Sequence, residues 1–380
     1  MKAPPQPADS PRVTARELPA LLDSGQIRRV LFSRPERVGD VLFMTPILRK
    51  FKDTYPDVSV SCLTSGYSRQ ALAHHPLVDE VIAFDPKASH LTRWYEYRKV
   101  RQSIRERSFD LAVQLSSNRR VRRCIERAGV ARVVSDYVTP DFRQPRHVVE
   151  QLFDNGDPLG LQGPPGPLEL YPGEAAESRV EAFVKEHQIG LDQPMAVIHP
   201  GCFQIRGRRR KPASWRRVWP AEYFGRLAEL LYSELGLTVV FSANGRDECR
   251  LVRELSESLS TPSILGFDLD IAELGALLAR ASVFVSVDTG PMHVAAAMKT
   301  PLIALFGPSP PHFTGPWGDG PQIVLKKDLP CSPCRGMNTP CSDNICMKQI
   351  LPEEVVEAAG RLMKAPDLDS GNRQAGQGTA

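Results

Sequence analysis

The stretch Ser282–Gly307, "SVFVSVDTGPMHVAAAMKTPLIALFG", carries the most specific pattern in the chain. An apolar run precedes "DTGP", a tract of small residues follows, and a second apolar run closes the stretch. The apolar runs predict buried strands, and the tract between them predicts a short helix that can begin at Pro291. The small side chains of Ala295–Ala297 would allow this helix to pack close to a sheet.

Strand-like and helix-like segments alternate through the rest of the chain, which predicts an α/β fold. Strands are expected at 28–34, 58–65, 78–85, 110–117, 131–137, 194–201, 237–245, 282–287 and 301–307. Helices are expected at 41–56, 100–109, 177–190, 221–236, 246–259, 271–281 and 291–299. Because strands separated by helices form parallel sheets covered on both faces, each half of the chain predicts a doubly wound, Rossmann-like domain. Pro46 should kink the first helix or mark its first full turn.

A length of 380 residues favours two domains. The stretch at 159–174 is rich in Pro and Gly and is the best candidate for the segment that joins them. We therefore expect an N-terminal domain at 13–165 and a C-terminal domain at 166–365, with disordered tails at 1–12 and 366–380. Ligands bind outside the carboxyl ends of the strands in such sheets, so the site should lie in a cleft between the domains.

The net charge of +4 does not by itself indicate a nucleic-acid partner. Basic residues gather at 118–123, "NRRVRR", where a solvated face is expected. They gather again at 206–211, "RGRRRK", where a solvated loop and an anionic partner both stay open. No apolar run reaches the ~18 residues of a membrane-spanning helix, and the Pro-rich N-terminus does not resemble a signal peptide. We expect a cytoplasmic protein.

The turn "RPERVGDVLFMTP" places Gly39 and Asp40 where a helix follows a strand. Glycine lets the backbone approach a ligand closely. Asp40 stands where an N-cap belongs, and its carboxylate could accept the first amides of the helix. At the mouth of the cleft, the same carboxylate could serve as general base toward an acceptor hydroxyl. The residues alone leave both alternatives open.

Two turns in the second half carry charges that suit a phosphate or a ribose. Arg217 stands just ahead of the "WP" that opens a helix, where its charge and the helix amides together suit a phosphate. The run at 206–211 offers further candidates. Glu248, in the loop after the strand at 237–245, could cap the next helix or accept ribose hydroxyls.

Asp288, Thr289 and Gly290 form the turn of the opening stretch. The amides there should form an anion site. Because Asp288 would repel two phosphates, the backbone of Thr289 and Gly290 is the better phosphate contact. Arg217 would provide the opposite charge, and Asp288 should accept sugar hydroxyls. His293 lies one turn into the helix and faces either the core or the cleft.

Taken together, these motifs resemble glycosyltransferase family 9, the ADP-heptose:lipopolysaccharide heptosyltransferases. The resemblance covers about residues 28–363 and rests on "GDVLFMTPILRKFKDTYP", "IHPG", "RRVWP", "VSVDTGPMHVAAAMKTPLIALFG" and "CSPC…CM", in this order. The helix "MTPILRKFKDTYPD" is more similar to the third heptosyltransferase of core assembly than to the first two. The resemblance implies a GT-B fold, in which two Rossmann-like domains face each other across a cleft.

The resemblance also implies an inverting transfer of heptose from ADP-heptose to the inner core of lipopolysaccharide. Asp40 would be the general base on the N-terminal, acceptor-binding domain, with Gly39 and Arg37 beside the acceptor. The residues expected to bind the donor on the C-terminal domain are Asp288, Thr289, Gly290, His293, Arg217 and Glu248.

No cofactor or metal would be needed, because fixed positive charge and amide dipoles stabilise the leaving diphosphate. The family usually has Lys at the position of Arg217, but Arg keeps the charge and offers a bidentate grip on phosphate. The expected partners are ADP-heptose and the lipopolysaccharide core acceptor, with peripheral contact at the inner face of the inner membrane and no nucleic acid.

Two other functions stay open, one catalytic and one not. A sugar-nucleotide epimerase could use the same architecture, but the acid and base pattern of that class is not found. A non-catalytic nucleotide-sugar-binding protein of envelope assembly is the other, and the presence of both Asp40 and Asp288 argues against it.

Four of the eight cysteines crowd into 16 residues. Their composition permits a structural zinc site. We expect free thiols instead, because the spacing lacks a second C-x2-C pair and because the resemblance assigns no metal there. The residues are Cys331, Cys334, Cys341 and Cys346.

Overall fold

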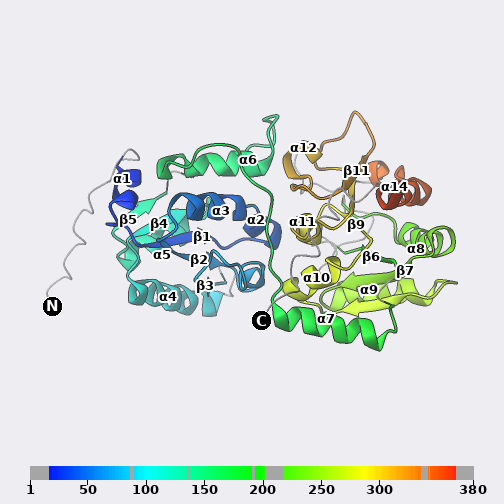
Figure 1. Cartoon of the computed structure of the whole chain (residues 1–380). Helices are drawn as coiled ribbons and strands as arrows, with labels where there is room; N and C mark the ends of the chain where they lie inside the picture. The colour runs from blue at the N-terminus through cyan, green and yellow to red at the C-terminus, as the bar shows by residue number, and fades with distance from the viewer. Residues whose placement is uncertain are drawn as a thin grey trace.

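A computed structural model describes residues 17–85, 90–135, 137–190, 193–201, 217–334, 341 and 343–364. Two parallel sheets lie side by side, each covered by helices (Figure 1). The predicted α/β class is therefore confirmed. The tails predicted at 1–12 and 366–380, and the basic run at 206–211, lie outside the described residues.

The N-terminal sheet is wound outward from its centre in both directions. Its strands are β1 (Arg29–Arg34), β2 (Ser59–Thr64), β3 (Glu80–Ala83), β4 (Leu111–Gln114) and β5 (Arg132–Val134). They are all parallel, in the order β3-β2-β1-β4-β5. The winding reverses between β1 and β4, and ligands of doubly wound sheets bind beyond the carboxyl ends of strands at such a point.

The C-terminal sheet repeats this plan with one more strand. Its strands are β6 (Met195–His199), β7 (Thr238–Ala243), β8 (Ile264–Phe267), β9 (Val283–Val287), β10 (Leu302–Phe306) and β11 (Gln322–Lys326). They are parallel in the order β11-β10-β9-β6-β7-β8, so the winding reverses between β6 and β9. The sequence analysis missed β8 and β11, because these edge strands are only partly buried and lack a continuous apolar run.

Helices connect the strands of both sheets. Those of the N-terminal half are α1 (Leu18–Asp23), α2 (Val38–Leu42), α3 (Thr45–Thr54), α4 (His90–Arg107), α5 (Arg119–Ala128) and α6 (Val148–Phe153), with 3-10 turns η1 (Arg69–Ala71) and η2 (Asp154–Leu159). Those of the C-terminal half are α7 (Glu174–Glu186), α8 (Ala221–Leu235), α9 (Arg246–Glu257), α10 (Ile271–Leu278), α11 (Gly290–Ala297), α12 (Pro311–Thr314), α13 (Ile345–Lys348) and α14 (Pro352–Lys364). Pro46 lies in the first turn of α3, so it starts a second helix where one was predicted. No helix in the described part of the chain has the length and apolar character needed to span a bilayer.

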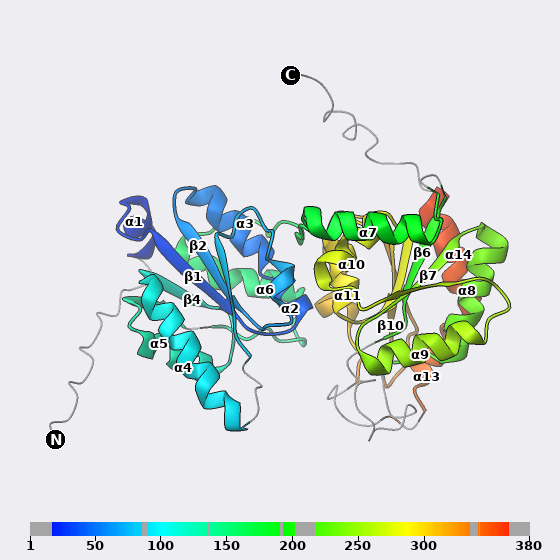
Figure 2. The same ribbon diagram turned by 90° about the horizontal axis from the view of Figure 1, so that it is seen from below.

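One apolar core continues from the first sheet to the second. It includes Phe32 of β1 and Phe284 of β9, both fully buried. Leu168 and Leu170, in the stretch predicted to join the domains, belong to the same core. Figure 2 shows α2 and α11 side by side where the two halves meet. The predicted boundary between residues 165 and 166 stays a prediction.

Trp219 anchors the loop that leads into α8. Its indole is fully buried, with the ring of Phe224 at 4.7 Å. The indole Nε1 donates a hydrogen bond to the carbonyl oxygen of Ile350, 2.9 Å away. This bond ties the start of α8 to the turn before α14, and the Asn344 side chain, which donates to the Val218 carbonyl at 2.7 Å, holds the same segment beside Arg217.

We predict that Trp219→Phe lowers the free energy of unfolding by about 1–3 kcal/mol, because the buried Ile350 carbonyl loses its donor. Urea denaturation followed by circular dichroism measures the change. Trp94→Phe is the matched control, because Trp94 is 68% exposed and should tolerate the same replacement. Equal stabilities of the two variants would contradict the prediction.

Candidate functional site

Two helix starts meet where the halves of the protein touch. α2 follows β1 and α11 follows β9, so both begin at the carboxyl end of an inner strand. A Cβ atom added to Gly290 would lie 3.7 Å from Cβ of Val38. One added to Gly39 would lie only 2.6 Å from Cδ2 of His293. Two motifs 250 residues apart in the sequence (39 against 289–290) are therefore neighbours in space.

Asp40 lies in the first turn of α2 but does not cap it. The N-cap position belongs to Arg37, whose backbone is extended, so the alternative in which Asp40 is the N-cap is wrong. The Asp40 side chain is 38% exposed, and its Oδ1 lies 3.5 Å from Nη2 of Arg34. Arg37 is exposed at the start of the same helix. A carboxylate that is fixed on one side and open on the other can meet a hydroxyl that arrives from solvent.

Arg34 holds the Asp40 loop in place, and the sequence analysis did not assign it a role. Its guanidinium is buried and donates hydrogen bonds to the backbone carbonyls of Asp40 and Leu115 and to the Tyr137 hydroxyl. Burial acts to lower the pKa of Arg34, but the carboxylates of Glu36 and Asp40 outweigh it and raise that pKa above the usual arginine value. The sequence offered one indication of this buried role, which is an arginine placed at the end of an apolar strand.

Asp288 and Arg217 form an ion pair at the start of α11. The Asp288 side chain is 7% exposed, and its Oδ2 lies 3.2 Å from Nη1 of Arg217. The same nitrogen donates to the Asp288 carbonyl oxygen at 3.3 Å. Thr289 is the N-cap and Gly290 the first residue of α11, and within the described residues no side chain caps this helix. The backbone amides at its start therefore sit beside a guanidinium, an arrangement that attracts anions.

Glu248 lies beneath the end of β6. It is 3% exposed, and its Oε2 accepts a hydrogen bond from the backbone amide of Asn244 at 3.1 Å. Nε2 of His199 lies 3.8 Å from the same oxygen. A Cβ atom on Gly201 would meet the Glu248 carboxyl carbon at 2.6 Å. The carboxylate thus tethers Asn244, the residue before the N-cap Gly245, and lies close to the end of β6. Binding of ribose hydroxyls by Glu248 stays a prediction.

His293 is buried at the contact between the two halves. Its ring meets the ring of Phe43 edge-on at 4.6 Å, and its Nδ1 has no hydrogen-bond partner among the described residues. Burial is the main cause that lowers the pKa of His293 to about 3, and His147 and Arg217 add to it. His293 is therefore neutral at physiological pH.

His147 is a second buried histidine at this contact, and the sequence analysis missed it. Its Nδ1 accepts the Val149 amide at 3.1 Å in a capping box with Glu150, so Nε2 carries the proton and donates to the Gly315 carbonyl at 3.0 Å. The ring stacks on Trp317 at 4.7 Å. Burial lowers the pKa of His147 to about 4. The pattern "HVVE" (147–150) was the available signal, because Glu at the third helix position typifies a capping box.

The four clustered cysteines lie next to the end of β10. Cys346 is buried, and burial together with the neighbouring thiols of Cys334 and Cys341 raises its pKa to about 11. In the described part of the chain, no group of three His, Cys, Asp or Glu residues is placed to hold a metal ion. The expectation that the protein needs no metal or cofactor stays a prediction.

The model of glycosyltransferase family 9 (heptosyltransferase) matches residues 147–344, a little over half of the chain. The chain belongs to glycosyltransferase family 9. It is thus a glycosyltransferase, and the epimerase and the non-catalytic binding protein are set aside.

Relatives and solved structures agree with this assignment. Lipopolysaccharide heptosyltransferase 3 of Escherichia coli K12 is 23% identical over 89% of this chain and 98% of its own length. A family 9 glycosyltransferase from Veillonella parvula has a TM-score of 0.75 at 22% identity, covering 88% of this chain and 97% of its own. An E. coli heptosyltransferase solved with ADP has a TM-score of 0.62 at 18% identity, covering 88% and 99%. The predicted GT-B fold is confirmed. Heptosyltransferases 1 and 2 match at 26% and 25% identity, so identity does not single out the third type.

We predict that the protein loses stability as the pH falls from 6.5 toward 4. The pKa values of His147 and His293 in the folded state are lowered to about 4 and about 3, so the unfolded chain binds protons that the folded protein does not. Each histidine then lowers the free energy of unfolding by about 1.4 kcal/mol for each unit that the pH falls within this window. Above pH 6.5 neither histidine changes it.

Urea denaturation at about pH 7 and about pH 5 measures this slope, to which carboxyl groups also contribute. Between these two pH values, His293→Gln should therefore lose less free energy of unfolding than the parent protein does. The difference should equal the contribution of one histidine. His74→Gln is the control, because His74 is exposed. An unchanged slope in His293→Gln would contradict the prediction, because His293 would then bind protons equally in the folded and unfolded states.

Proposed function

We propose that this family 9 enzyme transfers a heptose from ADP-heptose to the inner core of lipopolysaccharide, with inversion at the anomeric carbon. The observation that carries the proposal is the close approach of the start of α2, which carries Asp40, to the start of α11, which follows Asp288. One carboxylate can then serve the acceptor while the opposite turn binds the donor. The names of the relatives, lipopolysaccharide heptosyltransferases, support the choice of sugar and acceptor.

The donor side follows from the distribution of charge. The amides of Thr289 and Gly290 and the guanidinium of Arg217 would bind the diphosphate, because the Asp288 carboxylate repels it. Asp288 would accept hydroxyls of the sugar, and it shares Arg217 with the phosphates. Glu248, near the end of β6, would accept ribose hydroxyls. The heptosyltransferase solved with ADP supports an adenine nucleotide as donor.

The acceptor side comprises Asp40 with Arg37. As an acceptor hydroxyl attacks the anomeric carbon, Asp40 would take its proton, and the bond from that carbon to the diphosphate oxygen would break. The electron pair leaves with the diphosphate, where amides and Arg217 stabilise the charge without a metal. Exposed Arg37 would attract anionic groups of the core. Gly39 serves mainly by having no side chain, because its backbone touches His293.

We predict that Asp40→Asn lowers kcat at least about 100-fold, because a positioned general base contributes about that much or more. Transfer from ADP-heptose to a truncated core acceptor is the assay. ADP should still raise the melting temperature of the variant, because the donor side is intact. Asp53→Asn, an exposed change on α3, is the matched control. Full activity of Asp40→Asn would exclude Asp40 as the base.

We also predict that ADP raises the melting temperature and that UDP does not. Arg217→Gln should weaken ADP binding at least about tenfold, since charge-assisted bonds to phosphate contribute about 1.5–3 kcal/mol. Arg217→Lys should retain part of the affinity because it keeps the charge. Isothermal titration calorimetry measures the affinity for ADP of the parent protein and of the two variants. Stabilisation by UDP alone would overturn the proposed donor.

A further inference from the structure

A groove lined by arginines lies between α4 and α5, away from the contact between the two halves. The two helices run side by side in the N-terminal half, as Figure 2 shows. The groove has a volume of about 480 Å³. We call it the arginine groove, and its principal residues are Trp94, Arg98, Arg101, Arg120, Arg123 and Arg127.

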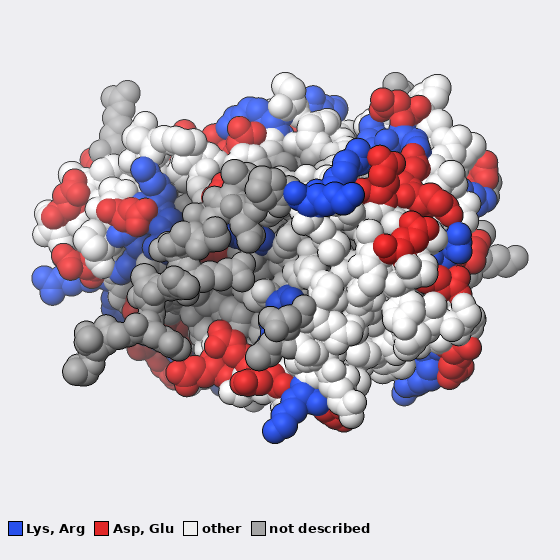
Figure 3. All heavy atoms as spheres, turned by 45° about the vertical axis from the view of Figure 1, so that its right-hand side comes forward, with Lys and Arg blue, Asp and Glu red and all other residues white. Residues whose placement is uncertain are grey.

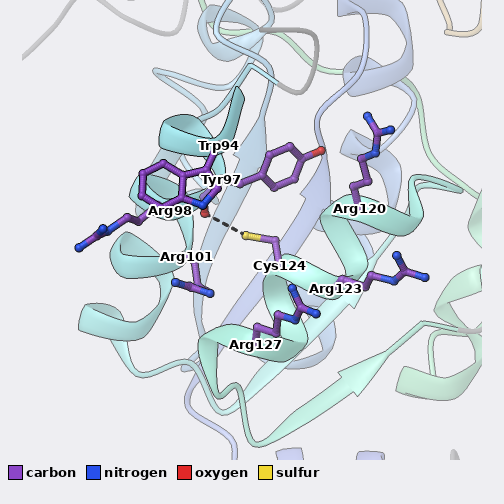
Figure 4. Close-up of a pocket in the computed structure, with 8 residues that line it drawn as sticks. All are labelled: Trp94, Tyr97, Arg98, Arg101, Arg120, Arg123, Cys124 and Arg127. Carbon is purple, nitrogen blue, oxygen red and sulfur yellow. Dashed lines mark hydrogen bonds between the residues drawn. The ribbon is translucent and has the colours of Figure 1, made fainter. Parts of the chain in front are cut away.

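Helical spacing brings these side chains to one place. Trp94, Arg98 and Arg101 lie four and three residues apart on α4, and Arg120, Arg123 and Arg127 lie three and four apart on α5. Residues at such spacing share one helix face, so two stripes of arginine oppose each other. Figure 4 shows these side chains around the gap between the helices.

Among the residues that the structure describes, none of the five guanidinium groups of the groove forms an ion pair with a carboxylate. Arg98 instead lies over the Trp94 ring, 5.4 Å from its centre. Arg122, one residue from the groove face, pairs with Glu126 at 2.9 Å. On the face of the molecule in Figure 3, acidic and basic side chains are interspersed. Five like charges repel one another, and an anionic ligand would relieve that repulsion.

An exposed aromatic ring, that of Trp94, lines the groove, and the next residue along α4, Tyr95, is exposed as well. Trp94 is 68% exposed and Tyr95 is 60% exposed, which is unusual for rings of this size. Trp and Tyr gather at the boundary of lipid bilayers, where their rings reach the apolar layer and their polar groups stay in water. Basic residues beside such rings bind the phosphates of anionic lipids.

The start of α5, which carries Arg120, lies near the proposed acceptor side. α5 begins directly after the loop at 115–118, where the Ser116 hydroxyl donates a hydrogen bond to Glu36 at 2.8 Å. Glu36 belongs to the β1–α2 loop that leads to Asp40. A surface held against the arginine groove would therefore lie beside the loop that carries the proposed base.

We infer that the arginine groove docks the protein onto a bilayer surface rich in anionic phospholipid. The arginines would bind headgroup phosphates, and Trp94 and Tyr95 would enter the interface. The inference rests in part on the proposed function, because a lipopolysaccharide core acceptor is anchored in a bilayer. The lining residues span only two helical turns, about 11 Å, which fits a few phosphates better than the track of a polynucleotide.

Vesicle sedimentation without donor or acceptor tests the surface itself. The parent protein should bind vesicles of phosphatidylcholine mixed with phosphatidylglycerol and should not bind pure phosphatidylcholine. The triple variant Arg120→Gln, Arg123→Gln and Arg127→Gln should bind about 100-fold more weakly, since each basic residue near an anionic surface contributes about fivefold. All three residues are exposed, so the fold should tolerate the change.

The matched control removes the same charge from the other half of the protein. Arg226→Gln, Arg250→Gln and Arg361→Gln also lower the net charge by three, and each of these arginines already lies near a carboxylate. Vesicle binding of this control should stay within about twofold of the parent protein. Equal losses in the two triple variants would overturn the inference, because binding would then follow net charge alone.

Two further measurements identify the ligand class. The tryptophan emission should shift to shorter wavelength on binding anionic vesicles, and Trp94→Phe should remove the shift while Trp317→Phe keeps it. Two outcomes would overturn the bilayer assignment. One is that inorganic phosphate at millimolar level competes with vesicles for the protein. The other is that the protein binds a single-stranded oligonucleotide through the same arginines and does not bind vesicles.

Turnover separates this inference from the proposed function. The triple variant of the groove should keep the parent rate on a delipidated, water-soluble core acceptor and lose rate on acceptor embedded in anionic vesicles. Loss of rate on both acceptors would overturn the docking role. Absence of transfer by the parent protein, with vesicle binding intact, would instead contradict only the proposed function.

Discussion

The contact between the backbone of Gly39 and the ring of His293 sets the distance between the two halves of the site. A side chain at Gly39 would come within 2.6 Å of that ring, so α2 and α11 can approach this closely only with glycine there. His293 in turn is held edge-on against Phe43. The carboxylates of Asp40 and Asp288 owe their relative position to this apolar contact rather than to any bond between them.

Each of these carboxylates is held by an arginine from its own half. Arg34 lies buried beneath Asp40, and Arg217 lies at the start of α11 beside Asp288. The two pairs differ in exposure, since the Asp40 side chain is 38% exposed and that of Asp288 is 7% exposed. A more open carboxylate suits proton transfer with an arriving group, while a more buried one suits fixed recognition of hydroxyls.

The inner strands and the turns that follow them could be predicted from the sequence because apolar runs and helix-start residues are local signals. The meeting of Gly39 with His293 could not, because nothing in either stretch encodes its distant partner. The role of Arg34 was hidden for a related reason. A charged residue at a strand end usually points to solvent, and two of the partners that hold this one inside, the Leu115 carbonyl and the Tyr137 hydroxyl, lie far along the chain. The sequence left open whether Asp40 caps α2, because helix boundaries inferred from sequence can be off by a residue or more, and the structure gives the N-cap position to Arg37 instead.

The apolar core that runs from Phe32 to Phe284 restricts how this molecule can open. A wide hinge rotation would pull apart the packed side chains at the joint, such as Val38 and Met292, and expose them to water. Sliding of α2 along α11 keeps that surface covered, so shear costs less than separation. The continuous core therefore favours small relative displacements of the two halves over their wide separation.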